Sequence, residues 1–323
     1  KGLNVEEFRG IKECQHSIKF SKFNILVGRN NSGKSSILEA LSLLPYPRSF
    51  FKPYNQERIT SLYDLHYSNA SLIYGYAGKA RLTYDLGMDK IWYIEIFDDG
   101  RNRAYYMEDS SEISLSTEGI AEFFGVNEKI IDNLSFFIPN HTQFLEKLQI
   151  IDEKTRNLMI KKGAHVKAAR LINECIDDRY TEILLTGGAP LQARKEISPE
   201  NLYYIHLKDL GDGIEKAITT ILWIETLEPK ILLWDDFEAT MHPSLIKNML
   251  KYLLKKGIQT MLSTHSIDVL YEISELKPKD TIILQLYKDK KDAFNYQTIN
   301  MDELQDIMDA NLDPRLLVDA LKL

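Results

Sequence analysis

Eight consecutive residues constrain the fold of this chain more than any other feature. Residues 28–35 read GRNNSGKS and match the pattern G-x-x-x-x-G-K-[ST]. They follow an apolar run, FNILV at 23–27, that predicts a buried strand, and they precede apolar residues at helical spacing that end at Pro45. Glycines let backbone N–H groups turn around a phosphate, and a helix start favours an anion. This segment, called the P-loop below, therefore predicts binding of a nucleoside triphosphate.

Positions within the P-loop carry separate expectations. Lys34 is expected to reach the β- and γ-phosphate oxygens, and Ser35 is expected to ligate Mg²⁺. The alternative is an ordinary glycine turn with an exposed lysine, which the strand–loop–helix context disfavours. The predicted nucleotide-binding residues of this segment are Gly28, Asn30, Asn31, Ser32, Gly33, Lys34, Ser35 and Ser36.

Two later apolar runs end in polar residues that suit phosphate chemistry. The run at 230–234 is followed by Asp235, the expected Mg²⁺ ligand, and by Asp236, the expected polariser of the attacking water. The run at 258–263 is followed by Thr264 and His265, and a histidine there can donate a hydrogen bond to a γ-phosphate. The alternatives are a solvated strand end and a structural histidine, and the P-loop favours the functional interpretation of both.

The order of the patterns predicts an α/β fold built on a mostly parallel sheet. Helical stretches at 214–227 and 244–256 alternate with the strands already named and with a further one at 281–287. Residues 72–106 favour an antiparallel β subdomain, and the spacing turns helical from Glu118 to about Leu185. We therefore expect an ATP-binding core with its β subdomain at 1–110 and 200–323, and an inserted helical lobe at 111–199.

Together these motifs resemble those of ABC-class P-loop ATPase heads. The Walker A motif at 28–35, the Walker B motif at 231–236, Glu238 with His242-Pro243, and the switch histidine His265 follow the order of that class. Phe8-Arg9-Gly10-Ile11 and Asp313-Pro314-Arg315 are more similar to the RecF, SMC and OLD-like branch than to transporter cassettes. The chain has neither the coiled-coil arms of SMC proteins nor the nuclease domain of OLD proteins, so we expect a stand-alone ATPase.

The resemblance implies ATP and Mg²⁺ as cofactors and a head-to-tail homodimer that closes on two ATP molecules. The loop expected to bind the second copy's nucleotide is Leu210-Gly211-Asp212-Gly213, which departs from the LSGGQ sequence of transporters. An aspartate facing a phosphate is repulsive, so backbone N–H groups are expected to make the contact. An alternative for Asp212 is a helix N-cap with Glu215 three residues later. The resemblance also suggests Arg9 as the adenine-side residue and, weakly, Gln143 as a Gln-loop equivalent.

A second departure from the family pattern concerns the rate of hydrolysis. The family usually has glutamate directly after the Walker B aspartate, whereas this chain has the shorter Asp236. We therefore expect a slow, Mg²⁺-dependent ATPase that signals to DNA or to an effector protein, in DNA repair or anti-phage defence. Glu238 is expected to be structural. The alternatives are a nucleotide-gated scaffold with negligible turnover and, less favoured, the motor subunit of a transporter.

Composition limits the partners that this chain can take through charge. Its 323 residues carry 40 Lys and Arg against 47 Asp and Glu, a net charge of −7, which excludes binding of nucleic acid through overall positive charge. The densest basic stretch, residues 154–170, suits either DNA phosphates or one solvated helix face. Two widely spaced cysteines and the lack of an apolar segment long enough to cross a bilayer predict a cytoplasmic protein without a membrane partner.

Overall fold

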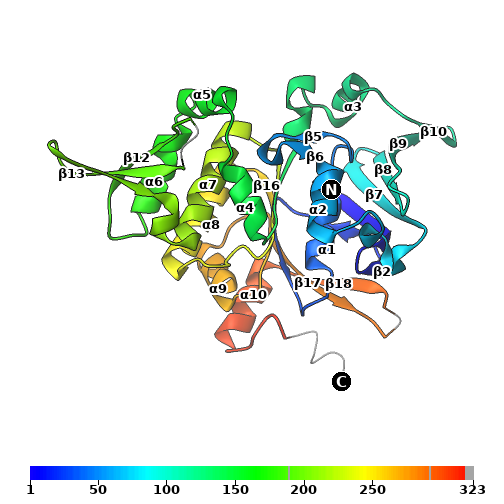
Figure 1. The fold of residues 1–323 in the computed structure, drawn as a ribbon. Coiled ribbons are helices and arrows are strands. Elements are labelled where there is room, and N and C mark those ends of the chain that lie inside the picture. Colours follow the sequence, from blue (N-terminus) through cyan, green and yellow to red (C-terminus); the bar gives the residue numbers. More distant parts are fainter. Residues whose placement is uncertain (188–189, 291, 317–323) are drawn as a thin grey trace.

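The computed structural model describes residues 1–187, 190–290 and 292–316. Two sheets and several helices form layers, with helix α1 (Lys34–Ser42) between the sheets (Figure 1). One apolar core lies between the antiparallel sheet, α1 and the near face of the parallel sheet. A second core lies between the far face of the parallel sheet and helices α7 (Asp212–Leu227), α8 (Pro243–Lys256) and α9 (Ile267–Leu276). Both faces of the parallel sheet are therefore covered, as its continuous apolar strands require.

The predicted site residues lie at the carboxyl ends of the strands of the mostly parallel sheet. Its strands occur in the order β11 (Ser135–Ile138), β15 (Ile231–Trp234), β16 (Gln259–Ser263), β4 (Phe23–Val27), β17 (Thr281–Lys288) and β18 (Phe294–Ile299). The first five are parallel, and β18 pairs antiparallel with β17. Ile138, Trp234 and Leu262 are partners in register, so β11, β15 and β16 end side by side. The predicted α/β P-loop fold is confirmed in this part.

The antiparallel sheet forms the predicted β subdomain. Its strands occur in the order β10 (Ser111–Ile113), β9 (Asn102–Glu108), β8 (Lys90–Phe97), β7 (Lys79–Gly87), β1 (Gly2–Phe8) and β2 (Ile11–Glu13), and β3 (Ile18–Lys19) pairs with β1. Alternate side chains of β1, β7 and β8 are buried against α1, which is the pattern of a sheet with one covered face.

A buried carboxylate joins three strands of this sheet. The Glu95 side chain on β8 is fully buried and pairs with Lys79 at 2.9 Å and Arg81 at 2.8 Å, both on β7. It also pairs with Arg103 on β9 at 2.5 Å. Burial alone would raise the pKa of Glu95, but the hydrogen bonds from these three cations outweigh it and lower the pKa to about 2.

The lobe combines helices with a small sheet. It contains α4 (Thr142–Gln149), α5 (Glu153–Lys161) and α6 (Ala164–Asn173), and then β12 (Tyr180–Leu184), β13 (Gln192–Ser198) and β14 (Asn201–His206). Helix α3 (Thr117–Phe124) lies within the same stretch of sequence but packs on the antiparallel sheet, where Phe123 and Phe124 contact Trp92 of β8. Helices α4, α5 and α6 contact α7, and the β13–β14 hairpin projects away from the rest of the molecule (Figure 1). The α-helices and β-strands of the described residues also include α2 (Arg58–His66), α10 (Met301–Asp309) and the short pair β5 (Phe50–Phe51) and β6 (Gln56–Glu57).

One expectation for the lobe is wrong. The helical spacing predicted from Glu118 to Leu185 is interrupted by β11 and β12, because short apolar runs such as SFFI at 135–138 fit a buried strand as well as a helix. All four residues of β11 are buried, and the strand belongs to the core sheet although it lies within residues 111–199. The division into a core and a lobe at those bounds stays a prediction.

Capping residues fix the helix that follows the β15 loop. His242 is the N-cap of α8 and accepts a hydrogen bond from the Ser244 amide, and Pro243 occupies the first turn. Gly257 ends α8 in the left-handed conformation, with φ of +65°. The two lysines of the last turn place positive charge at the C-terminal end of the helix dipole, which stabilises the helix. Within the residues that the structure describes, none of the helices has the length and apolar character needed to span a bilayer.

Candidate nucleotide-binding site

The P-loop connects β4 to α1 in a conformation that depends on glycine. A Cβ on Gly28 would lie 2.4 Å from the Leu286 carbonyl oxygen, and Gly33 has a φ of +102°. Lys34 is 6% exposed, and its ammonium donates to the carbonyls of Gly28 at 2.9 Å and Arg29 at 3.1 Å. Burial lowers the pKa of Lys34, against the effect of nearby carboxylates. The loop thus holds a buried cation at the start of a helix, where N–H groups have no intrahelical partner.

Ser35 and Asp235 meet at the end of β15. The Ser35 hydroxyl lies close enough to the Asp235 carboxylate to lower its pKa, and the Ser263 hydroxyl donates to Asp235 Oδ1 at 2.5 Å. Burial raises the pKa of Asp235, and the two serine hydroxyls partly offset that effect. Hydroxyl and carboxylate oxygens are the hard ligands that Mg²⁺ prefers, together with substrate phosphates. These residues therefore fit the predicted ion.

Asp236 and His265 lie together, as a shared role requires. Asp236 has a φ of +44°, and its amide donates to the Ser263 hydroxyl at 2.7 Å. Its Oδ1 lies 3.8 Å from His265 Nε2, and its Oδ2 accepts a hydrogen bond from Asn140 Nδ2 at 3.0 Å. A single serine hydroxyl thus positions both acidic residues at the end of β15.

Asn140 was not among the predicted site residues. It lies just after β11, at a strand end like the other site residues. The sequence pattern of a polar residue after an apolar run indicates such a place, but only if residues 135–138 are read as a strand and not as part of a helix. Gln143, which the resemblance suggested weakly for a neighbouring role, is exposed in the first turn of α4 and does not line the P-loop cavity.

The turn that carries His265 is held by two further groups. The His265 amide donates to Glu238 Oε1 at 2.8 Å, and the His265 carbonyl accepts from Arg315 Nη1 at 2.5 Å. Arg315 also pairs with Asp313 at 2.6 Å. Both Glu238 and Arg315 thus bind the backbone of residue 265, which leaves the imidazole itself to face Asp236.

A cavity of about 550 Å³ unites most of the predicted residues. Its wall includes residues of the P-loop, residues that follow β15 and β16, and residues from the β1–β2 turn and from the segment that follows α2: Arg9, Gly10, Asn30, Asn31, Gly33, Lys34, Ser35, Ser36, Ser71, Ile73, Tyr74, Gly75, Tyr76, Asp236 and His265. The Ser32 hydroxyl is buried without a hydrogen bond in the described structure, and Gly28 and Ser32 line a smaller cavity beside β17.

Arg9 lines this cavity with its guanidinium already engaged. Its Nε donates to Glu39 Oε2 at 2.8 Å, and its Nη1 donates to the Ser71 carbonyl at 3.3 Å. Glu39 is a buried residue of α1, and its other oxygen lies 3.0 Å from His66 Nε2. Arg9 therefore connects the β1–β2 turn to the P-loop helix and to the segment after α2.

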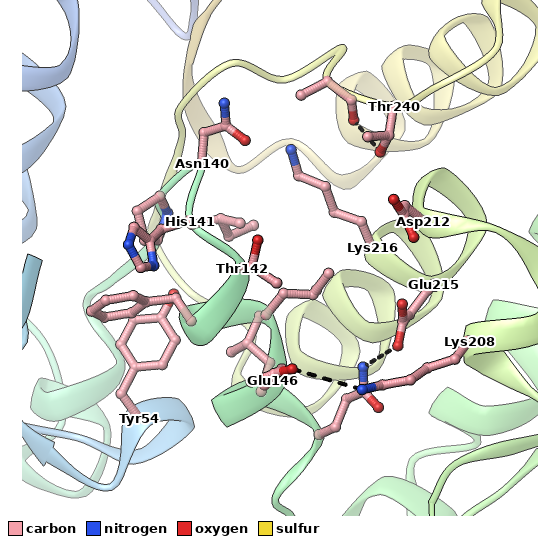
Figure 2. A pocket seen from close by; sticks show the side chains of 17 residues that line it. Tyr54, Asn140, His141, Thr142, Glu146, Lys208, Asp212, Glu215, Lys216 and Thr240 are labelled. Atoms are coloured by element: carbon pink, nitrogen blue, oxygen red, sulfur yellow. Dashed lines mark hydrogen bonds and ion pairs between the residues drawn. The ribbon is translucent and has the colours of Figure 1, made fainter.

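The loop at 211–213 lies outside the P-loop cavity. Asp212 lines a second cavity of about 260 Å³ between the starts of α4 and α7 (Figure 2). A Cβ on Gly213 would lie 2.3 Å from the Thr240 carbonyl oxygen, so α7 packs directly on the loop after β15. The N-cap alternative for Asp212 is wrong, because Gly211 is the N-cap of α7, and Glu215 instead accepts a hydrogen bond from Gln149 at 2.6 Å.

Lys216 connects this second cavity to the loop that follows β15. The side chain is 7% exposed, and its ammonium donates to the Asp236 carbonyl at 3.2 Å and lies 5.5 Å from the centre of the Trp234 ring. Figure 2 shows the ammonium on the side of the cavity formed by Asn140 and Thr240. Burial lowers the pKa of Lys216 to about 8, although the carboxylates of 235, 236 and 238 favour its charged form.

Several cations of the basic stretch at 154–170 have acidic partners. Lys167 pairs with the buried Glu225 at 2.7 Å, and Lys162 pairs with Glu228 at 3.2 Å. His165 lies 3.8 Å from Glu182. These ion pairs neutralise several of the positive charges. They favour the interpretation of this stretch as a solvated helix face and disfavour its interpretation as a surface for DNA phosphates.

Three comparisons with known proteins agree with this geometry. The model of a family described as "AAA domain, putative AbiEii toxin, Type IV TA system" matches residues 23–271. The DNA replication and repair protein RecF of Vibrio campbellii is 48% identical over 48 residues, which is 15% of this chain and 13% of that protein. RecF of Aliivibrio fischeri is 46% identical over 48 residues, with the same coverage. The matched segment thus spans a small part of these relatives.

Solved structures of SMC heads share the fold. A head bound to the C-winged helix domain of ScpA aligns with a TM-score of 0.58 at 11% identity, over 95% of this chain and 99% of that one. A Pyrococcus furiosus head with an extended coiled coil, bound to the C-terminal domain of ScpA, aligns with a TM-score of 0.55 at 10% identity, over 96% and 98%. At these identities the likeness shows the fold alone.

Proposed function

This chain belongs to that AAA domain family and has the fold of a P-loop ATPase head of the RecF and SMC branch, and on this premise we propose that it binds and slowly hydrolyses ATP. The observation that carries the proposal is the meeting of Ser35 with Asp235, beside a cavity that Lys34, Asp236 and His265 also line. A buried cation, two oxygen ligands and a carboxylate beside a histidine are what phosphoryl transfer to water requires.

Each residue has a definite role in this proposal. The ammonium of Lys34 exchanges its loop carbonyls for β- and γ-phosphate oxygens, and P-loop N–H groups bind the same phosphates. Ser35 and Asp235 hold Mg²⁺, which when bound neutralises phosphate charge. Asp236 orients the attacking water and is itself held by Asn140, and His265 donates to the γ-phosphate. The short Asp236 side chain is the reason for slow turnover.

ATP binding is proposed to close two copies head to tail. Residues 211–213 do not line their own chain's P-loop cavity, and Gly211 and Asp212 are exposed, so these two residues are accessible to a second copy. The φ of +92° at Gly211 and the position of the loop at the N-terminus of α7 suit backbone contact with a phosphate. ATP drives closure only by binding the closed state more tightly, and this loop supplies the added contacts.

The output of the cycle is proposed to reach DNA or an effector protein in the cytoplasm, in DNA repair or anti-phage defence. The family description names a toxin system, and the RecF relatives are named for DNA replication and repair. A second candidate is a nucleotide-gated scaffold with negligible turnover, which the short carboxylate of Asp236 favours.

Lys34→Ala tests the proposal. We expect calorimetry with ATP and Mg²⁺ to show binding by the wild-type protein and a loss of at least about 100-fold in affinity for the variant, because a charge-assisted contact to two phosphates disappears. Lys255→Ala, on the exposed end of α8, is the matched control and keeps wild-type affinity. Phosphate release by the wild type separates the enzyme from the scaffold, and a folded wild-type protein without any heat of ATP binding contradicts both.

A further inference from the structure

The turn between β16 and α9 carries His265, and local hydrogen bonds fix the residues on either side of it. The Thr264 amide donates to a carbonyl of β4 at 3.1 Å, and Ser266 is the N-cap of α9. The peptide groups of His265 itself bind side chains from other parts of the chain. The N–H group donates to Glu238, and the carbonyl accepts from Arg315, which lies 50 positions later.

The guanidinium of Arg315 is oriented by a carboxylate two residues earlier. Asp313 accepts from Arg315 Nε at 2.9 Å and from Nη2 at 2.6 Å, and it also accepts from the Arg315 amide at 2.9 Å. The carboxylate occupies one edge of the planar group, and Nη1 donates to the His265 carbonyl at 2.5 Å. Because the guanidinium is rigid, its pairing with Asp313 determines where Nη1 points.

The segment that carries Arg315 is attached to the same end of the parallel sheet. Gln285 on β17 is 1% exposed, and its Nε2 donates to the carbonyl of the buried Pro314 at 2.9 Å. Gln285 is also the register partner of Val27 on β4, the residue directly before the P-loop. The backbone that precedes Arg315 is thus fixed to the strand beside β4, at the level where the P-loop begins.

Arg315 lies beside the proposed reaction site but not in the wall of the cavity proposed to hold the nucleotide. It lines the smaller cavity that Gly28 and Ser32 also line, and it is not among the described residues that line the P-loop cavity. His265 does line the P-loop cavity, with its Nε2 3.8 Å from Asp236 Oδ1. Arg315 is therefore expected to act on the reaction through His265.

We propose that Arg315 is a positioning residue for ATP hydrolysis, which holds the His265 backbone so that the imidazole stays beside Asp236. This inference rests on the proposed function and deepens it, because it adds to the hydrolytic site a segment that follows α10. Glu238 fixes the N–H side of His265 and Arg315 fixes the carbonyl side, so loss of either leaves a single anchor. A small displacement of a group that acts in the transition state lowers the rate more than it lowers ground-state affinity.

Steady-state phosphate release and calorimetry with ATP and Mg²⁺ test this role. We expect Arg315→Ala to lower kcat about tenfold or more and to leave KM and the affinity for ATP within about twofold, because the P-loop and Asp235 are untouched. The contact to the His265 carbonyl needs a single donor, which an ammonium supplies. Arg315→Lys is therefore expected to keep kcat within about threefold of the wild-type value.

Arg101→Ala is the matched control. Arg101 follows Asp99 in the same Asp-x-Arg arrangement, and its amide donates to Asp99 Oδ1 at 2.9 Å and its Nε to Oδ2 at 2.7 Å. It lies in the turn between β8 and β9, so it is expected to leave kcat and ATP affinity unchanged. Thermal unfolding checks that each variant folds.

Three results overturn the positioning role. They are an unchanged kcat in Arg315→Ala, a loss of ATP affinity in that variant as large as its loss of kcat, and a kcat of Arg315→Lys as low as that of Arg315→Ala. A wild-type protein that binds ATP and releases no phosphate is a different failure, because it contradicts the proposed hydrolysis itself and this inference with it.

Discussion

At the scale of single residues, the carboxylate of Asp236 is oriented by the side-chain amide of Asn140. We expect Asn140→Ala to lower the kcat of ATP hydrolysis about 10- to 100-fold with little change in KM, because the amide holds the carboxylate proposed to orient the water and leaves Lys34 untouched. Steady-state phosphate release measures both constants. Gln143→Ala is the control, since this exposed side chain lies one turn away and outside the cavity. A larger loss for Gln143→Ala than for Asn140→Ala contradicts this assignment.

The site residues that the sequence predicts are those that belong to a local pattern, in which an apolar strand is followed directly by polar residues. The P-loop, the acids after β15 and the histidine after β16 each follow an apolar strand, so position along the chain indicates their place at the sheet edge. Ser263 and Glu39 reach the site through tertiary contacts with residues far away in sequence. A serine at a strand end and a glutamate in a helix have no local pattern that distinguishes them.

At the scale of elements, the Glu95 cluster holds β7, β8 and β9 together. We expect Glu95→Gln to lower the free energy of unfolding at pH 7 by about 3 kcal/mol, because it removes one charge from a buried ionic group. The pKa of Glu95 is about 2 in the folded protein against 4.5 normally, so its contribution is complete above pH 4.5 and is lost as the pH falls toward 2.

Urea denaturation at pH 7, 5 and 3 checks this expectation. The difference between wild type and Glu95→Gln is expected to narrow only below pH 4.5. Glu112→Gln removes another carboxylate that pairs with Arg103, but one that is 44% exposed, and it is expected to cost less than about 1 kcal/mol. Equal effects of the two substitutions contradict the role given to burial.

Long helices and strands could be predicted from the sequence, whereas a short strand such as β11 could not. Long strands such as β8 and β17, and helices such as α7 and α8, agree with the predicted positions because their periodicity extends over many residues. The four residues of β11 are too few for their spacing to separate strand from helix. Their strand conformation comes from pairing with β15, a partner nearly one hundred positions later, which local sequence does not encode.

At the scale of the whole molecule, the proposed cycle predicts a change of mass. Asp236→Asn keeps Lys34, Ser35 and Asp235 for binding but loses the carboxylate that orients water, so ATP persists and a closed dimer accumulates. Light scattering with ATP and Mg²⁺ is expected to report twice the monomer mass of 37.4 kDa. The double variant that adds Lys34→Ala stays monomeric. An unchanged mass for ATP-bound Asp236→Asn argues against closure.

The packing of α7 on the loop after β15 has a mechanical consequence. The backbone at Gly213 lies so close to the Thr240 carbonyl that a side chain there would clash. About one turn further along the same helix, the Lys216 ammonium donates a hydrogen bond to the Asp236 carbonyl. Two attachments so close together make the start of the helix and that loop a single stiff unit. In the proposed dimer, a displacement of Gly211 by the second copy is therefore transmitted, within the same subunit, to the backbone of Asp236, the residue proposed to orient the water.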